Sequence, residues 1–218
     1  MGAKRTVRIG SRSVAVIACV ALAAAVVAML VRDARESAGA GPAPPCPEAF
    51  FDQPARAERL RGLLGSTEDG RALLDALGES EVRFCFGTIE VPVVTSERVL
   101  LLDTRAADPE SAARAGHLLQ HVVRGAPMPA EIAPGVDCDA VVLAALEREA
   151  AAYALEIRLR RALGVHERRY AFEDAYAEAG EHAILDYLVE HPEGGPGMDG
   201  LGAAYRQRCE LGRAAPRR

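Results

Sequence analysis

From residue 55 onward, apolar residues recur mostly at spacings of three and four, which is the period of one face of a helix. Two segments depart from this period. β-Branched and aromatic residues dominate 81–94, and "RVLLLD" at 98–103 is a short apolar run suited to a buried strand. The pattern predicts an α+β domain over 55–212, mostly helical with one small sheet. Two helices are predicted within 55–80, and one each near 108–125, over 139–164, within 172–191 and over 200–211.

The first 31 residues follow a different pattern. Four basic residues, the last of them Arg12, precede an uncharged run from Ser13 to Val31. A helix of that length rises roughly 28 Å, which is close to the hydrocarbon thickness of a bilayer. Because a basic flank stays in the cytoplasm, we predict a cytoplasmic segment at 1–12, a single transmembrane helix at 13–31 and an extracytoplasmic remainder.

The same segment also has features of a cleavable signal peptide. The apolar core of a signal peptide is about 7–15 residues long, so the length of this run favours an uncleaved anchor, although "SAGA" at 37–40 offers a small-residue cleavage site. Residues 32–54 are rich in Gly, Ala and Pro, which is typical of a linker, and 213–218 form a basic tail. The sequence therefore predicts one exported domain on a membrane tether.

Composition narrows the classes of function. The 218-residue chain has a formal charge of -5 that is spread along the sequence, so it lacks the basic patch typical of nucleic-acid binding. Of its five cysteines, Cys19 lies in the apolar run, which leaves an even number in a compartment expected to be oxidising. We predict disulfides among Cys46, Cys85, Cys138 and Cys209. Three pairings are open, and four reduced thiols are the alternative.

Two histidines, His117 and His121, lie four residues apart on the helix predicted near 108–125. On a helical wheel they fall opposite an arc of Ala, Leu and Val side chains, so they are expected to face solvent or a cleft. Side chains at i and i+4 are neighbours, and neutral imidazole is a good zinc ligand, so the pair can share one ion. Chance placement of two histidines on the protein surface is the alternative.

A carboxylate on the next helix is a candidate third donor. Glu149 lies near the middle of the apolar face of the helix predicted over 139–164, and Glu156 shares this face two turns later. A carboxylate buried without a partner is costly or loses its charge. Glu149 therefore needs an arginine, hydrogen bonds or a metal ion, and zinc commonly takes two histidines together with one glutamate.

The order of strand 98–103, a helix with His-x-x-x-His and then the helix "EREAAAYALEIRLRRALG" resembles the zincin metallopeptidases, over roughly residues 60–165. The chain is most similar to the gluzincin branch, in which a glutamate on the following helix is the third zinc ligand. The resemblance implies a zincin-like fold in which His117, His121 and Glu149 bind zinc. It also implies that the strand pairs with an extended substrate.

The motif departs from the family at one position. Zincins of the H-E-x-x-H type carry the general-base glutamate directly after the first histidine, where this chain has Leu118. General-base catalysis contributes about 10²–10⁴-fold, so the resemblance and this departure from it imply a metallopeptidase homologue that is catalytically impaired, with a protein or peptide partner. The apolar run at 13–31 makes it a membrane-anchored one. One alternative is a non-enzymatic, membrane-tethered helical interaction domain without metal. Another is an active hydrolase with a different base.

Overall fold

A computed structural model describes residues 43–91, 93–95, 98–195 and 200–214. All of these residues belong to one compact unit, which begins at Ala43. The segments predicted as cytoplasmic (1–12) and transmembrane (13–31) therefore lie outside the described residues. Within the described ranges, no helix is both long and apolar enough to cross a membrane.

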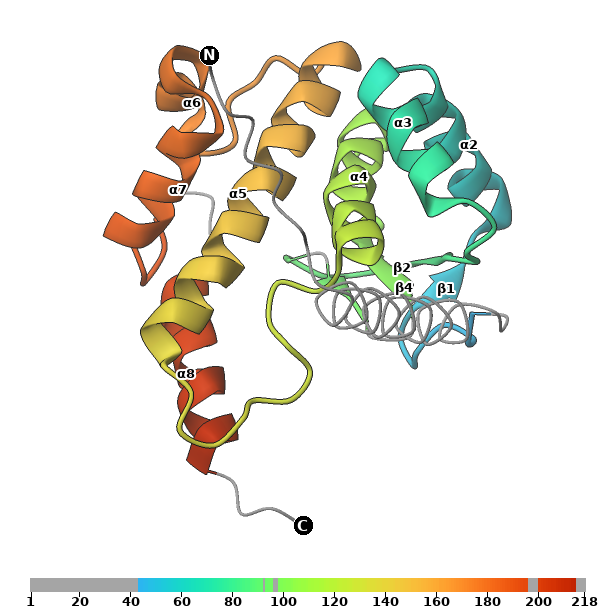
Figure 1. The fold of residues 1–218 in the computed structure, drawn as a ribbon. Coiled ribbons are helices and arrows are strands. Elements are labelled where there is room, and N and C mark those ends of the chain that lie inside the picture. Colours follow the sequence, from blue (N-terminus) through green and yellow to red (C-terminus); the bar gives the residue numbers. More distant parts are fainter. Residues whose placement is uncertain (1–42, 92, 96–97, 196–199, 215–218) are drawn as a thin grey trace, which may run out of the picture. The chain divides into compact units, whose positions relative to one another are not determined.

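The described unit is α+β and mostly helical with one small sheet, as the spacing of apolar residues predicts (Figure 1). The described strands are β1 (Phe51–Asp52), β2 (Arg83–Gly87), β3 (Val93–Val94) and β4 (Val99–Asp103). The described helices are α2 (Pro54–Gly65), α3 (Glu68–Leu77), α4 (Asp108–Arg124), α5 (Cys138–Ala162), α6 (Glu173–Ala179), α7 (Glu181–Glu190) and α8 (Leu201–Ala214).

The sheet has the strand order β1–β2–β4–β3. Its centre is the parallel pair β2 and β4, in which Arg83 lies opposite Val99 and Gly87 lies opposite Asp103. β1 pairs antiparallel with β2, and β3 pairs antiparallel with β4. The central strands are rich in Phe, Val and Leu, which suit a pleated, buried surface. β3 forms one edge of the sheet and contacts α4.

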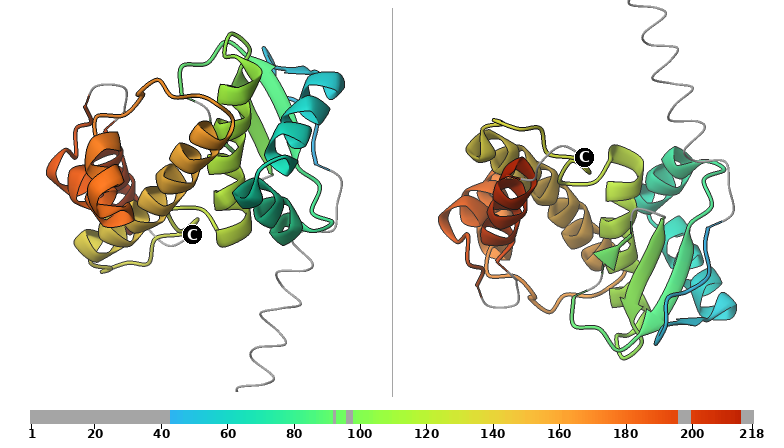
Figure 2. Two further views of the ribbon diagram at one scale, coloured as in Figure 1. Left: turned by 90° about the horizontal axis from the view of Figure 1, so that it is seen from above. Right: turned by 90° about the horizontal axis from the view of Figure 1, so that it is seen from below.

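α4 is the central helix of this unit. It packs against α2 and α3, against β3 and β4, and against α5, which separates it from α6 and α7 (Figures 1 and 2). One apolar core joins α2, α4 and the sheet and includes Leu60, Phe84 and Leu119. A second core joins α5 to α7 and includes Ile157 and Ile184. α4 and α5 are consequently buried on more than one face.

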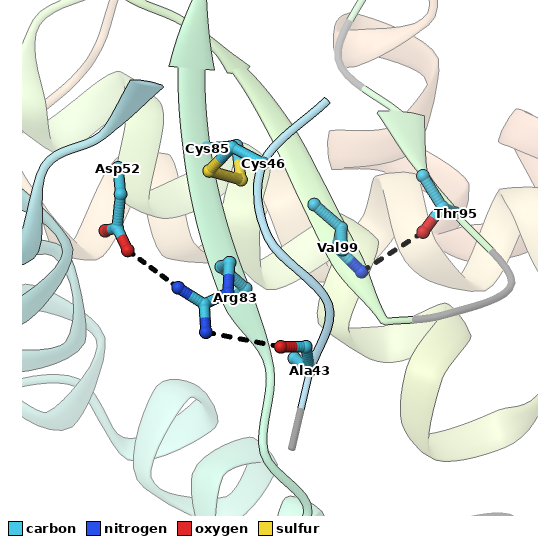
Figure 3. Close-up of a disulfide and its surroundings, with 7 residues drawn as sticks. All are labelled: Ala43, Cys46, Asp52, Arg83, Cys85, Thr95 and Val99. Atoms are coloured by element: carbon cyan, nitrogen blue, oxygen red, sulfur yellow. Dashed lines mark hydrogen bonds and ion pairs between the residues drawn. A yellow bond between two sulfur atoms is a disulfide. The ribbon is translucent and has the colours of Figure 1, made fainter. Parts of the chain in front are cut away.

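The compact unit begins at Ala43 rather than at residue 55, where the sequence predicts the end of the linker. Part of that linker is folded onto the domain, because it supplies β1 and because Cys46 is bonded to Cys85 of β2 (Figure 3). Arg83 of β2 donates hydrogen bonds to Asp52 and to the carbonyl of Ala43. A strand of two residues is too short to show a periodic pattern, so the sequence gives no sign of it.

The second disulfide links Cys138, at the start of α5, to Cys209 on α8. Both sulfurs lie in a small apolar cluster with Met128 and Ala145. Of the three pairings that the sequence leaves open, the structure forms Cys46–Cys85 and Cys138–Cys209. Two disulfides are typical of a protein that matures in an oxidising compartment.

The helix predicted within 172–191 is interrupted at Gly180. This residue has a positive φ of 71°, a conformation that glycine adopts without steric penalty, and it separates α6 from α7. Gly125, with a φ of 95°, is the residue at which α4 ends. Asp108 is the first residue of α4, and its carboxylate pairs with Arg56 and Arg59 of α2.

Candidate metal centre

Three side chains from α4 and α5 converge on one point. The Nε2 atom of His117 lies 3.3 Å from Nε2 of His121 and 3.2 Å from Oε2 of Glu149. The Nε2 atom of His121 lies 3.4 Å from the same carboxylate oxygen. The two histidines and the glutamate that the sequence singles out thus form a nearly equilateral triangle of donor atoms, and this group is able to hold a metal ion.

The size of this triangle matches the coordination geometry of zinc. In a regular tetrahedron the ligand atoms lie about 1.63 times the metal–ligand distance apart, so zinc bonds of about 2.0–2.1 Å give edges of roughly 3.3–3.4 Å. The observed separations are 3.2, 3.3 and 3.4 Å. The three donors therefore have the spacing of one face of a zinc tetrahedron, which leaves the fourth position for a water or another ligand.

Both histidines are buried, with exposed fractions of 7% for His117 and 6% for His121. The helical wheel places them correctly away from the apolar arc, but α5 covers that side of α4, so they do not face open solvent. Tyr153 of α5 contributes to this cover, with its ring edge-to-face against His117 at 4.6 Å between centroids. By contrast, His166, His182 and His191 are exposed.

A second carboxylate holds the other ring nitrogen of His117. Its Nδ1 atom lies 3.1 Å from Oε2 of Glu156, although the angle departs from that of a good hydrogen bond. Glu156 is fully buried, receives a hydrogen bond from Tyr170 and forms an ion pair with Arg114. Metal-binding histidines commonly present their outer nitrogen to a carboxylate, which orients the ring and fixes its tautomer. Glu156 therefore directs Nε2 of His117 toward the shared point.

The third donor is also fixed by a neighbour. The hydroxyl of Tyr205, on α8, donates a short hydrogen bond to Oε1 of Glu149, which leaves Oε2 to face the two histidines. Burial and the negative charge of Glu149 raise the pKa of Tyr205 well above its usual value, so this hydroxyl remains protonated. Glu149 was expected to need an arginine, hydrogen bonds or a metal ion, and its partners in the structure are two histidines and a tyrosine.

The charges of the centre are strongly coupled. Burial opposes protonation of His117, but the adjacent carboxylates of Glu149 and Glu156 outweigh it and raise the pKa of His117 to about 9. Burial likewise opposes ionisation of both glutamates. The contacts of Glu149 with His117 and His121 nevertheless lower the pKa of Glu149 far below its usual range. The positive charge of Arg114, and after it that of His117, likewise lowers the pKa of Glu156. The two carboxylates therefore require a positive charge between them, either a proton on His117 or a metal ion.

The donor atoms open into a cavity of about 340 Å³ between α4, α5, α8 and β3. Its described lining includes Leu118, which is 6% exposed and also packs into the core beneath the sheet. Among the described lining residues, the only carboxylate is Glu149, one of the three candidate ligands. The apolar side chain of Leu118 therefore occupies the position of the general base in H-E-x-x-H zincins. Apart from Glu149, no carboxylate of the described residues lines the cavity.

Comparisons with known proteins give no relative of this chain. No family model, no curated protein and no solved structure matches it. The resemblance to zincins therefore stays a prediction from the sequence, and the structure adds that His117, His121 and Glu149 form a group able to hold a metal ion.

Proposed function

We propose that this domain is a zinc-binding, zincin-like protein in which His117, His121 and Glu149 hold the ion and in which peptide hydrolysis is impaired. The observation that supports it best is the triangle of donor atoms with edges of 3.2–3.4 Å. Two imidazoles and one carboxylate are a ligand set that zinc commonly uses in sites with an open position. The buried contacts of Glu156 and Tyr205 with this triangle further support a metal site rather than a chance cluster.

The same geometry also supports a metal-free alternative. A protonated His117 between Glu149 and Glu156 would neutralise part of their charge, and the domain would then be a structural or interaction module. In this alternative the separations of 3.2 and 3.4 Å between the imidazoles and Glu149 are those of ion pairs. The alternative gives no role to the cavity onto which the donor atoms open. Metal content separates the two proposals directly.

The full chain, purified in detergent and dialysed against zinc, is expected to contain about one zinc per molecule. His117→Ala is expected to lose this zinc, because it removes one of three protein ligands and the contact with Glu156. Elemental analysis by mass spectrometry measures the stoichiometry. His182→Ala is the matched control, since His182 is exposed and on α7, and it should bind zinc normally. A folded wild-type chain without zinc, or zinc retained in His117→Ala, would exclude this site.

Impaired hydrolysis is the second part of the proposal, and it concerns Leu118. The wild-type chain is expected to cleave unfolded protein slowly, whereas Leu118→Glu should gain zinc-dependent activity. The gain should not exceed the 10²–10⁴-fold that a general base contributes, and about 10³-fold is the middle of that range. Release of fluorescent peptides from labelled casein, with and without a chelator, measures this. Leu118→Gln is the control, because it has similar size but accepts no proton as a base. Equal activity in wild type and Leu118→Glu would contradict the role assigned to this position.

We further propose that residues 13–31 hold the domain at a membrane, outside the cytoplasm. The arginine-flanked apolar run supports this placement, and the two disulfides support an oxidising compartment. A mature chain whose N-terminus begins near Ala40 or beyond would show cleavage and contradict the anchor. A protein or peptide that reaches the cavity from the same compartment is the partner that the resemblance to metallopeptidases favours.

A further inference from the structure

The cavity beside the metal centre is mostly apolar. Val91, Val93, Val94, Leu118, Met128 and Leu201 belong to its described lining. Val91 and Val93 remain 44% and 41% exposed, so apolar side chains lie open to solvent beside the centre. The volume of about 340 Å³ falls within the range of roughly 300–1,000 Å³ that is typical of small-molecule sites. Leu118, which stands where the H-E-x-x-H motif has glutamate, is part of this apolar surface.

The two arginines in the described lining of the cavity, Arg114 and Arg208, differ in their partners. Arg114 is paired with Glu156 and stacks on the ring of Tyr170, so its charge is balanced within the protein. Arg208 of α8 also lines the cavity, and its guanidinium donates to the carbonyl of Pro129 at 3.3 Å. No carboxylate of the described residues forms an ion pair with Arg208. Among the described residues, the hydrogen-bond partner of the Arg208 guanidinium is thus a neutral carbonyl, that of Pro129.

Arg208 lies on the same side of α8 as the metal centre. It follows Tyr205 by three residues, and side chains at i and i+3 of a helix are neighbours. Tyr205 itself contacts Glu149, a candidate metal ligand, and Arg208 lines the same cavity as both. A zinc ion with Glu149 as its single charged ligand would leave one positive charge, and Arg208 adds another. The site as a whole therefore favours an anionic ligand.

We propose that the cavity binds a small aliphatic carboxylate, with its carboxylate at the open side of the metal centre, its charge stabilised by Arg208, and its chain against the apolar wall that includes Leu118. This inference rests on the proposed metal site and adds the chemical class of its ligand. A carboxylate needs no general base, so a centre with leucine at that position binds such a molecule without hydrolysing it. Free short-chain acids and the C-terminus of an apolar peptide share this chemistry.

The test uses the full chain loaded with Co²⁺, because the visible absorption of cobalt responds when a ligand enters its coordination sphere. Hexanoate is expected to change the spectrum saturably, and hexanamide, which has the same chain but no charge, is expected to leave it unchanged. Acetate should bind at least fivefold more weakly than hexanoate, since it fills little of the apolar cavity. N-acetyl-leucine represents a peptide C-terminus, and its affinity relative to hexanoate distinguishes the two sources.

Two variants locate the binding. Arg208→Gln should weaken hexanoate binding at least fivefold while cobalt loading stays the same. Arg206→Gln is the matched control on the same helix, because Arg206 pairs with Asp139 instead of lining the cavity. Val93→Ser should weaken hexanoate but not acetate. A cobalt-loaded chain that ignores hexanoate, or binds acetate and hexanoate equally, would overturn the ligand class alone. A chain that takes up no cobalt would overturn the metal site and this inference together.

Discussion

Between pH 6.5 and 8.5, the metal-free protein is expected to lose stability while zinc becomes a stronger stabiliser. Both trends originate at His117, which lies between Glu149 and Glu156 of α5 and against His121 of its own helix. The hydroxyl of Tyr205 on α8 contacts the same group of charges through Glu149. No proton is needed on His117 when a metal ion supplies the positive charge, so the zinc-bound protein should not lose this stability as the pH rises.

The direction follows from the pKa of His117, which rises from 6.5 in a free side chain to about 9 in the folded protein. The stability that this proton contributes is fully present below pH 6.5 and is lost as the pH rises through about 9. One pKa unit corresponds to about 1.4 kcal/mol, so the loss approaches roughly 3 kcal/mol. The lowered pKa values of Glu149 and Glu156 affect stability at low pH instead, because the stability that these carboxylates contribute is lost as the solution becomes strongly acidic.

Zinc competes with the same proton. An imidazole must be neutral to bind the ion, so zinc binding releases the proton of His117, and the apparent affinity should rise about tenfold per pH unit while that proton is bound. Tenfold in affinity adds about 1.4 kcal/mol of stabilisation at a fixed zinc concentration well above Kd. Zinc is therefore expected to raise the melting temperature by only a little at pH 6.5 and by several degrees more at pH 8.5.

Melting curves of the full chain at pH 6.5, 7.5 and 8.5, with zinc or with a chelator, measure both trends. The difference between the two arms at each pH isolates the metal site from other titrating groups. His182→Ala should reproduce the wild-type behaviour, because His182 is exposed and lies on α7. A zinc-induced shift that is the same at all three pH values would contradict proton release from a ligand.

The sequence was sufficient to predict the three donor residues of the centre. His117 and His121 are four residues apart on one helix, so their proximity is local, and Glu149 was conspicuous as an acid within an apolar stripe. The burial of the histidines was harder to predict. A helical wheel describes one helix alone, whereas α4 packs against the sheet on one side and α5 on another, so its polar positions are buried too.

The neighbours of the ligands could not be predicted for a different reason. Glu156 lies on the apolar stripe of α5, as the sequence shows, but its contact with His117 depends on how α4 crosses α5. Tyr205 is separated from Glu149 by 56 residues and reaches it only after α8 packs against α5. Neither contact has a signature in spacing or composition. The pairing of the cysteines was open for the same reason, since it follows from tertiary structure.

Removing the disulfide between Cys138 and Cys209 is expected to weaken zinc binding as well as stability. The bridge holds α8 against the start of α5, and α8 supplies Tyr205, whose hydroxyl fixes Glu149. A cross-link between residues 71 apart stabilises by about 4 kcal/mol in the chain-entropy model, so the melting temperature should fall clearly. Loosening of α8 should also reduce zinc affinity by about tenfold or more, because losing a residue that hydrogen-bonds a metal ligand typically costs about 10–100-fold.

The other disulfide provides a matched control for this effect. Cys46–Cys85 spans 39 residues, so its loss should destabilise the fold by a similar amount, yet it joins the segment before β1 to β2 rather than to α4, α5 or α8 (Figure 3). The double variant Cys138→Ala/Cys209→Ala should therefore lose zinc affinity, and Cys46→Ala/Cys85→Ala should keep it. Tyr205→Phe retains both bridges and should match the first variant in affinity but not in melting temperature. Equal zinc affinity in the two double variants, measured by competition with a chromophoric chelator, would show that α8 does not support the metal centre.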